Sequence, residues 1–139
     1  DKSDHIAASA RLAGMKLLCA EDNTLNAEIL KSILELWQVS CDIYPDGRAL
    51  CDAFASSAPG DYDLILMDIQ MPLMNGYEAA RAIRSSSHPS ARTIPIIAMT
   101  ANAFADDVQQ SLDAGMNAHL SKPVDMQLLE QTLLSFRFI

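Results

Sequence analysis

The chain has few cysteines, and their spacing disfavours several classes of protein. Cys19, Cys41 and Cys51 are the three cysteines in 139 residues, and no two of them have C-x-x-C spacing. An odd number without that spacing argues against a disulfide framework and against a zinc site. We expect these side chains to pack as small buried hydrophobic groups.

Long apolar runs are also missing. No stretch approaches the roughly 18 residues of a membrane-spanning helix. The first residues, DKSDHIAASARLAG, lack the apolar core and the cleavage pattern of a signal peptide. We therefore expect a cytoplasmic domain that does not itself touch the membrane, whether or not a longer parent protein is membrane-anchored.

Basic residues are scarce relative to acidic ones. The chain has 10 Lys and Arg against 18 Asp and Glu, a net charge of −8. This excess disfavours non-specific binding of nucleic acid and favours a divalent cation as ligand. Residues 1–13 are rich in Ser, Ala and charge without an apolar period, which predicts a linker or a cloning remnant. The length then predicts one domain, over residues 15–139.

What the sequence does contain is a regular alternation of short apolar runs and amphipathic stretches. Continuous apolar strands, each followed by a helix, are typical of a parallel sheet covered on both faces, so we predict a doubly wound α/β sandwich. The predicted strands are MKLLCA, VSCDIY, YDLILMD, IPIIAMT and AHLS, at 15–20, 39–44, 62–68, 94–100 and 118–121. The predicted helices lie over 25–37, over 48–56, over 76–84, around Phe104, Val108 and Leu112, and from Asp125 onward.

Helix ends and helix faces can also be predicted. Asn75 is a candidate N-cap, Asp46 and Gly47 suggest a turn, and Gly115 is a candidate residue for ending a helix. The apolar faces are expected to comprise Ile29, Leu30, Ile33, Leu34 and Trp37 in the first helix, Leu50 and Phe54 in the second, and Leu129, Leu133 and Phe136 in the last.

The residues that leave the predicted strands form one group of candidates, because ligands of such sheets bind at the carboxyl ends of the strands. They are Glu21 and Asp22, Asp68, Thr100, and Lys122 followed by Pro123. Three carboxylates packed together repel one another unless a cation neutralises them, and oxygen ligands alone select a hard ion such as Mg²⁺. An ammonium and a hydroxyl opposite a carboxylate suit the oxygens of a phosphoryl group, and a carboxylate can act as a nucleophile.

Each candidate also has an ordinary explanation when taken alone. Asp68 would be a helix N-cap, and Glu21 and Asp22 would be a solvated helix start with Asn23 or Thr24 as cap. Lys122 would be a surface lysine and Thr100 a routine strand end. Four such explanations meeting at one edge of one sheet are much less economical than a single site.

Four stretches carry a resemblance to a known family: CAEDNTLN, DLILMDIQMPLMNGYEAARAIR, IPIIAMTANAF and DAGMNAHLSKPVD. In this order and spacing they resemble the receiver domain of two-component response regulators. Within that family the chain is most similar to the receivers of hybrid sensor histidine kinases. The resemblance implies the flavodoxin-like, CheY-like (βα)5 fold and a domain that accepts a phosphoryl group from a phosphohistidine, with Mg²⁺ as cofactor.

The resemblance also implies a role for each matching residue. Asp68 matches the phosphoacceptor, and Asp22 matches the direct Mg²⁺ ligand, joined by Asp68 and the backbone carbonyl of Gln70. Glu21 matches the acid that acts through metal-bound water. Lys122 and Thr100 match the residues that contact the phosphoryl oxygens, and a cis bond between Lys122 and Pro123 is implied as well.

His119 departs from the family pattern. It stands three residues before Lys122, where the family most often has a Tyr or Phe that acts with the threonine as a switch. Our hypothesis is that Thr100 moves toward the phosphoryl group and His119 moves into the vacated space. The alternative is a plain exposed histidine at a strand end.

The resemblance implies two protein partners, the phosphohistidine domain of a histidine kinase and a histidine phosphotransfer domain, and a domain that is monomeric in isolation. Such a domain catalyses only its own phosphorylation and dephosphorylation, at a rate that Gln70 and Asn102 are expected to tune. A stand-alone response regulator is the alternative. A haloacid-dehalogenase-like aspartyl-phosphate hydrolase would need an acid in place of Gln70, and a nucleotide-binding module would need a Gly-rich phosphate loop, which the chain lacks.

Overall fold

The computed structural model describes residues 11–71, 73–101, 105–122 and 124–137. Ten helices and strands alternate along this part of the chain. The strands are β1 (Lys16–Ala20), β2 (Ser40–Tyr44), β3 (Leu64–Asp68), β4 (Ile96–Thr100) and β5 (Ala118–Ser121). The helices are α2 (Thr24–Leu36), α3 (Gly47–Ala55), α4 (Gly76–Ser85), α5 (Ala105–Asp113) and α6 (Met126–Arg137).

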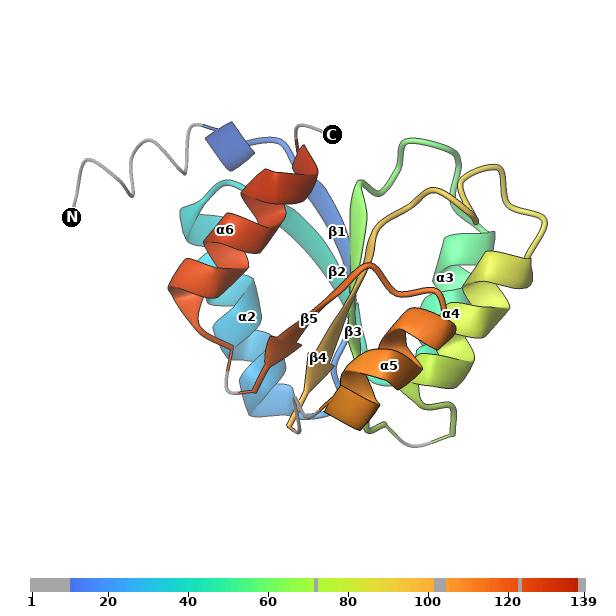
Figure 1. Ribbon diagram of the computed structural model, residues 1–139. Coiled ribbons are helices and arrows are strands. Elements are labelled where there is room, and N and C mark those ends of the chain that lie inside the picture. Colours follow the sequence, from blue (N-terminus) through green and yellow to red (C-terminus); the bar gives the residue numbers. More distant parts are fainter. Residues whose placement is uncertain (1–10, 72, 102–104, 123, 138–139) are drawn as a thin grey trace.

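The five strands form one parallel sheet in the order β2-β1-β3-β4-β5. Helices α2 and α6 cover one face, and α3, α4 and α5 cover the other (Figure 1). The carboxyl ends of the strands meet at the lower edge of the sheet in this view. The predicted doubly wound sandwich is therefore confirmed, and the predicted site residues that follow the strands lie along one edge.

The sheet is buried on both faces, which explains its uninterrupted apolar strands. On β3, Leu64 and Leu66 pack in a cluster with Trp37, while Ile65 and Met67 pack on the opposite face in a second cluster. All five residues of β3 are buried. Because successive side chains point to opposite faces and both faces are covered, the strand reads as a continuous apolar run rather than an alternating pattern.

Short polar side chains begin the helices that follow the strands. Asn23 accepts a hydrogen bond from the backbone N–H of Asn26, and Asn75 forms a reciprocal capping box with Glu78. Asp46 likewise accepts from the backbone N–H of Ala49. The predicted turn at Asp46 is thus the capped start of α3, since a carboxylate there satisfies a helix N–H that has no other partner.

Other predictions differ from the structure at the margins. Leu12, which lies inside the predicted linker, is fully buried in the cluster under α2 and α6. Ile29, expected on the apolar face of α2, is half exposed. Gly115 ends α5 with a φ of +94°, as predicted. Phe104, Asn102 and Pro123, and with it the expected cis bond, lie outside the described residues.

No helix within the described part of the chain is both long enough and apolar enough to cross a lipid bilayer.

Candidate active site

Three acidic side chains meet where two neighbouring strands of the sheet end. Glu21 and Asp22 directly follow β1, and Asp68 is the last residue of its neighbour β3. Each offers a carboxylate oxygen, and these oxygens all lie within 4.8 Å of one another. Glu21 and Asp68 are buried, whereas Asp22 is exposed. The structure therefore brings together the three acids that the sequence singled out.

Lys122, which follows β5, reaches across to two of these acids. Its Nζ atom lies 2.9 Å from Oδ2 of Asp68 and 3.0 Å from Oε1 of Glu21. It also donates a hydrogen bond to Oε2 of Glu21 at 3.2 Å. Three carboxylates and one ammonium leave an excess of negative charge at this edge of the sheet, which favours the binding of a cation.

The two oxygens of Asp68 have different surroundings. Oδ1 accepts a hydrogen bond from the backbone N–H of Gln70 at 3.3 Å. Oδ2 has Lys122 as an ionic partner but, among the described residues, accepts no aligned hydrogen bond. A buried oxygen without a directed hydrogen bond is costly unless another group supplies one. Both oxygens of Asp68 therefore keep bonding capacity for a further donor or a cation.

The electrostatics of the site follow from its burial. Removal from water raises the pKa of Asp68 to about 7, the neighbouring Glu21 contributes to this increase, and Lys122 opposes it. Burial alone would lower the pKa of Lys122, but its contacts with Asp68 and Glu21 outweigh that effect and the pKa is raised. The ammonium therefore stays charged, while Asp68 is only partly ionised near pH 7.

A cleft of about 340 Å³ opens beside these groups. Its lining residues are Asp22, Asn23, Asn26, Asp68, Gln70, Ala101 and Lys122. Carboxylate and amide oxygens dominate this lining, and oxygen ligands of this kind suit a hard divalent cation such as Mg²⁺. Asp22 and Asp68 fit direct ligands, and the expected contribution of the Gln70 carbonyl stays a prediction.

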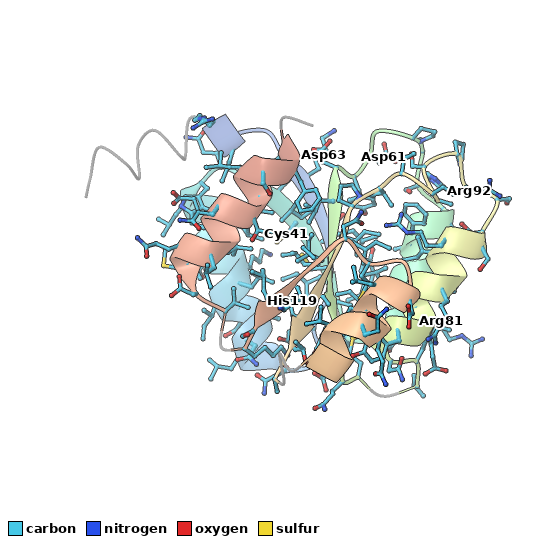
Figure 2. The ribbon with its side chains drawn as sticks, viewed as in Figure 1. Cys41, Asp61, Asp63, Arg81, Arg92 and His119 are labelled. Atoms are coloured by element: carbon cyan, nitrogen blue, oxygen red, sulfur yellow. The ribbon has the colours of Figure 1, made fainter. Side chains whose placement is uncertain are left out.

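Thr100 and His119 lie on the α5 side of the sheet. Thr100 is the buried last residue of β4 and lines a neighbouring hollow that also contains Gln70. His119 lies on β5, opposite Ala98, at the edge of the sheet between α5 and α6 (Figure 2), and it is exposed. Ala98 is two residues before Thr100, so the side chains of His119 and Thr100 are diagonal neighbours on one face of the sheet.

Sequence reasoning missed two features of the site. An apolar groove of about 330 Å³ runs beside the cleft, lined by Glu21, Asn26, Ile29, Leu30, Ile33, Met99, Lys122 and Val124. Gly76 packs so closely that a Cβ atom there would collide with the carbonyl oxygen of Asp68 and lie 2.9 Å from Cα of Ile69. The apolar period of α2 signalled the groove, whereas nothing local signals the close approach at Gly76.

Comparisons with known proteins agree with this geometry. The model of the response regulator receiver domain family matches residues 17–134. Histidine kinase 1 of Arabidopsis thaliana is 51% identical over 154 residues, and the aerobic respiration control sensor protein ArcB of Escherichia coli is 36% identical over 125 residues. The matches cover 89% and 90% of this chain but only 13% and 15% of those two proteins, so the chain spans a small part of their length.

Solved structures give the same result. The receiver domain of the sensor histidine kinase PA1611 from Pseudomonas aeruginosa, with magnesium in its active-site cleft, is 34% identical, with a TM-score of 0.81 and coverage of 91% of this chain and 100% of that one. The receiver domain of Saccharomyces cerevisiae Ssk1, in complex with the phosphotransfer protein Ypd1, is 28% identical, with a TM-score of 0.80 and coverage of 91% of each. This chain therefore belongs to the family of response regulator receiver domains.

Proposed function

We propose that Asp68 of this receiver domain accepts a phosphoryl group from a phosphohistidine, in a reaction that requires Mg²⁺. The observation that carries the proposal is the buried Asp68 carboxylate, with Lys122 Nζ at 2.9 Å and two further carboxylates within 4.8 Å. A carboxylate held beside a fixed cation suits nucleophilic attack on phosphorus, because the geometry is already arranged before the reaction starts.

Each described residue of the site has a distinct task in this reaction. An oxygen of Asp68 forms the new bond to phosphorus, the P–N bond of the donor breaks, and its electron pair returns to the ring nitrogen. Lys122 pairs with the incoming phosphoryl oxygens, and the Thr100 hydroxyl donates a hydrogen bond to one of them. Asp22, Asp68 and, through water, Glu21 would hold Mg²⁺, which would neutralise negative charge at the site.

The donor is proposed to be a protein, namely the phosphohistidine domain of a histidine kinase or a histidine phosphotransfer domain. The apolar groove adjoins the cleft and includes the half-exposed Ile29, and the neighbouring Leu25 is also exposed. Exposed apolar side chains beside a charged cleft are typical of a surface that binds another protein. The Ssk1 structure, which contains a phosphotransfer protein, supports this partner class.

The whole protein is proposed to be a hybrid sensor histidine kinase. The relatives named above are a histidine kinase and a respiration control sensor protein, both much longer than this chain, and a hybrid signal transduction histidine kinase of Dictyostelium discoideum is 36% identical over 128 residues. A cytoplasmic position for the domain is supported by its three free cysteines, which oxidising compartments disfavour.

Intact mass spectrometry after incubation with acetyl phosphate and Mg²⁺ tests the phosphoacceptor. We expect one alkali-labile phosphoryl adduct that requires Mg²⁺ and is lost in Asp68→Asn. Asp52→Asn is the matched control, because Asp52 is an exposed aspartate of α3 outside the cleft. An adduct that persists in Asp68→Asn would assign the phosphoryl group to another residue, and the proposal would be wrong.

A further inference from the structure

The charged cleft and the apolar groove meet at two residues. Lys122 and Asn26 line both hollows, whereas Asp68 lines only the cleft, and Ile29 and Leu30 line only the groove. Lys122 is already engaged with Asp68 and Glu21. A donor can place its phosphoryl group at Asp68 while the group that carries the phosphoryl lies in the groove. Such a donor therefore lies beside Asn26.

The side chain of Asn26 is not used by the helix that carries it. Asn26 stands three residues after the N-cap Asn23, and its backbone N–H donates to Oδ1 of Asn23 at 3.0 Å. In α4 the equivalent residue, Glu78, accepts a hydrogen bond from the backbone N–H of its own cap, Asn75, at 3.1 Å. In α2 the cap N–H of Asn23 instead donates to Oε2 of Glu21 at 3.4 Å. Among the residues that the structure describes, the exposed Asn26 amide thus keeps its donor and acceptor groups for another partner.

We propose that the Asn26 amide binds the imidazole ring of the phosphohistidine donor; this inference rests on the proposed function. An imidazole ring has flat apolar faces and polar nitrogen edges. The groove residues Ile29 and Leu30 offer apolar contact to a face, and the amide at the junction offers a hydrogen bond to an edge. The groove thus offers an apolar surface to the ring, and the junction with the cleft offers a hydrogen bond beside it.

The bond serves the leaving group during transfer. As the oxygen of Asp68 bonds to phosphorus, the P–N bond breaks and its electron pair returns to the ring nitrogen. The leaving nitrogen keeps this pair directed at phosphorus, so the Asn26 amide binds the other ring nitrogen. Its Oδ1 accepts a hydrogen bond from the N–H group there, and the ring departs as neutral imidazole. Acetate, the leaving group of acetyl phosphate, departs as a stable carboxylate and fills neither the groove nor the edge site, so it gains less from Asn26.

Two small phosphoryl donors, one with an imidazole leaving group and one without, test whether Asn26 acts on that leaving group. Phosphoimidazole carries the ring and the P–N bond, and acetyl phosphate carries neither. Phosphorylation rates are measured by intact mass with Mg²⁺ as a function of donor concentration, for wild type, Asn26→Ala, Asn26→Gln and the control Gln131→Ala, which removes an exposed amide from α6. Urea unfolding of each variant checks that the substitution leaves the fold intact.

We expect Asn26→Ala to slow phosphorylation by phosphoimidazole about three- to tenfold, because one hydrogen bond is lost. Phosphorylation by acetyl phosphate should slow by less than about twofold. Asn26→Gln keeps the amide and recovers part of the lost rate. Equal slowing with both donors, or slowing of the same size in Gln131→Ala, overturns the inference while leaving the proposed function standing. If wild type reacts with neither donor, the proposed function fails as well.

Discussion

Nζ of Lys122 lies 2.9 Å from Oδ2 of Asp68, so an ammonium group contributed by the loop after β5 neutralises the buried carboxylate that ends β3. The same atom lies 3.0 Å from Oε1 of Glu21. One lysine thus holds two buried acids together, and both would carry uncompensated charge without it. This relationship makes the stability of the domain and the chemistry of the site depend on the same contacts.

Lys122→Ala is expected to lower the free energy of unfolding by about 1–3 kcal/mol at pH 8 without Mg²⁺, because it leaves two buried carboxylates without a cation. Addition of Mg²⁺ should recover part of this loss, since the ion supplies positive charge to the same oxygens. Urea denaturation with and without Mg²⁺ measures both effects. Lys31→Ala, which removes an exposed lysine from α2, is the control. Equal losses in the two variants would contradict the bridging role.

Asp68→Asn is expected to stabilise the domain at high pH in the absence of Mg²⁺. The pKa of Asp68 is about 7 in the folded protein, against roughly 3.9 for an unperturbed aspartate. The folded state therefore binds this proton more tightly than the unfolded state does. The cost of ionising Asp68 is absent below about pH 4 and complete above about pH 7.

The difference in unfolding free energy between Asp68→Asn and wild type should accordingly grow from near zero at pH 4 to about 1–2 kcal/mol at pH 8, allowing for screening by water in the open cleft. Urea denaturation across this pH range measures it, with Asp52→Asn as control. A difference that does not change with pH would mean that burial of Asp68 carries no ionisation cost.

The sequence predicted the sheet well because burial on both faces leaves a local pattern. The run from Leu64 to Met67 is apolar at every position, and AHLS at 118–121 coincides with β5. The strand ends could then be grouped by topology alone, since parallel strands place their carboxyl ends at one edge. That reasoning brought together Glu21, Asp68 and Lys122 before any contact between them was known.

Contacts between distant segments could not be predicted in this way. Leu12 is a single leucine in a stretch without period, and the nearby Gly14 is held by a backbone hydrogen bond to Gln38. His88 lies in a loop that shows no pattern in the sequence, yet its Nε2 atom lies 2.9 Å from the carbonyl oxygen of Ser57, 31 residues earlier in the chain. Each contact depends on how separate elements pack, which no local spacing encodes.

Gly76→Ala is expected to disturb the phosphoacceptor without touching its side chain. An added Cβ would collide with the carbonyl oxygen of Asp68 and lie 2.9 Å from Cα of Ile69, so the backbone at the end of β3 must shift. We expect a loss of stability of about 1–3 kcal/mol and slower phosphorylation by acetyl phosphate.

Gly60→Ala is the control for this prediction. Gly60 has a φ of +91°, and an added methyl group there would meet only open space, so the substitution introduces backbone strain without a collision. It should therefore lower stability by about 1 kcal/mol and leave the phosphorylation rate unchanged. Urea denaturation and intact mass spectrometry measure the two effects, and an unchanged phosphorylation rate in Gly76→Ala would show that Asp68 tolerates the shift.

The last prediction concerns Thr100 and His119, and whether phosphorylation changes the structure on the α5 side of the sheet. They are diagonal neighbours on β4 and β5, because His119 pairs with Ala98, two residues before Thr100. Movement of the Thr100 hydroxyl toward a phosphoryl group on Asp68 would open space beside His119. We expect the ring resonances of His119 to shift on phosphorylation in nuclear magnetic resonance spectra, and to shift much less in Thr100→Ala. His88, held at Ser57 and Ser90, is the internal control and should not shift. An unmoved His119 ring in the phosphorylated wild type would mean that this histidine is only a solvent-facing strand residue.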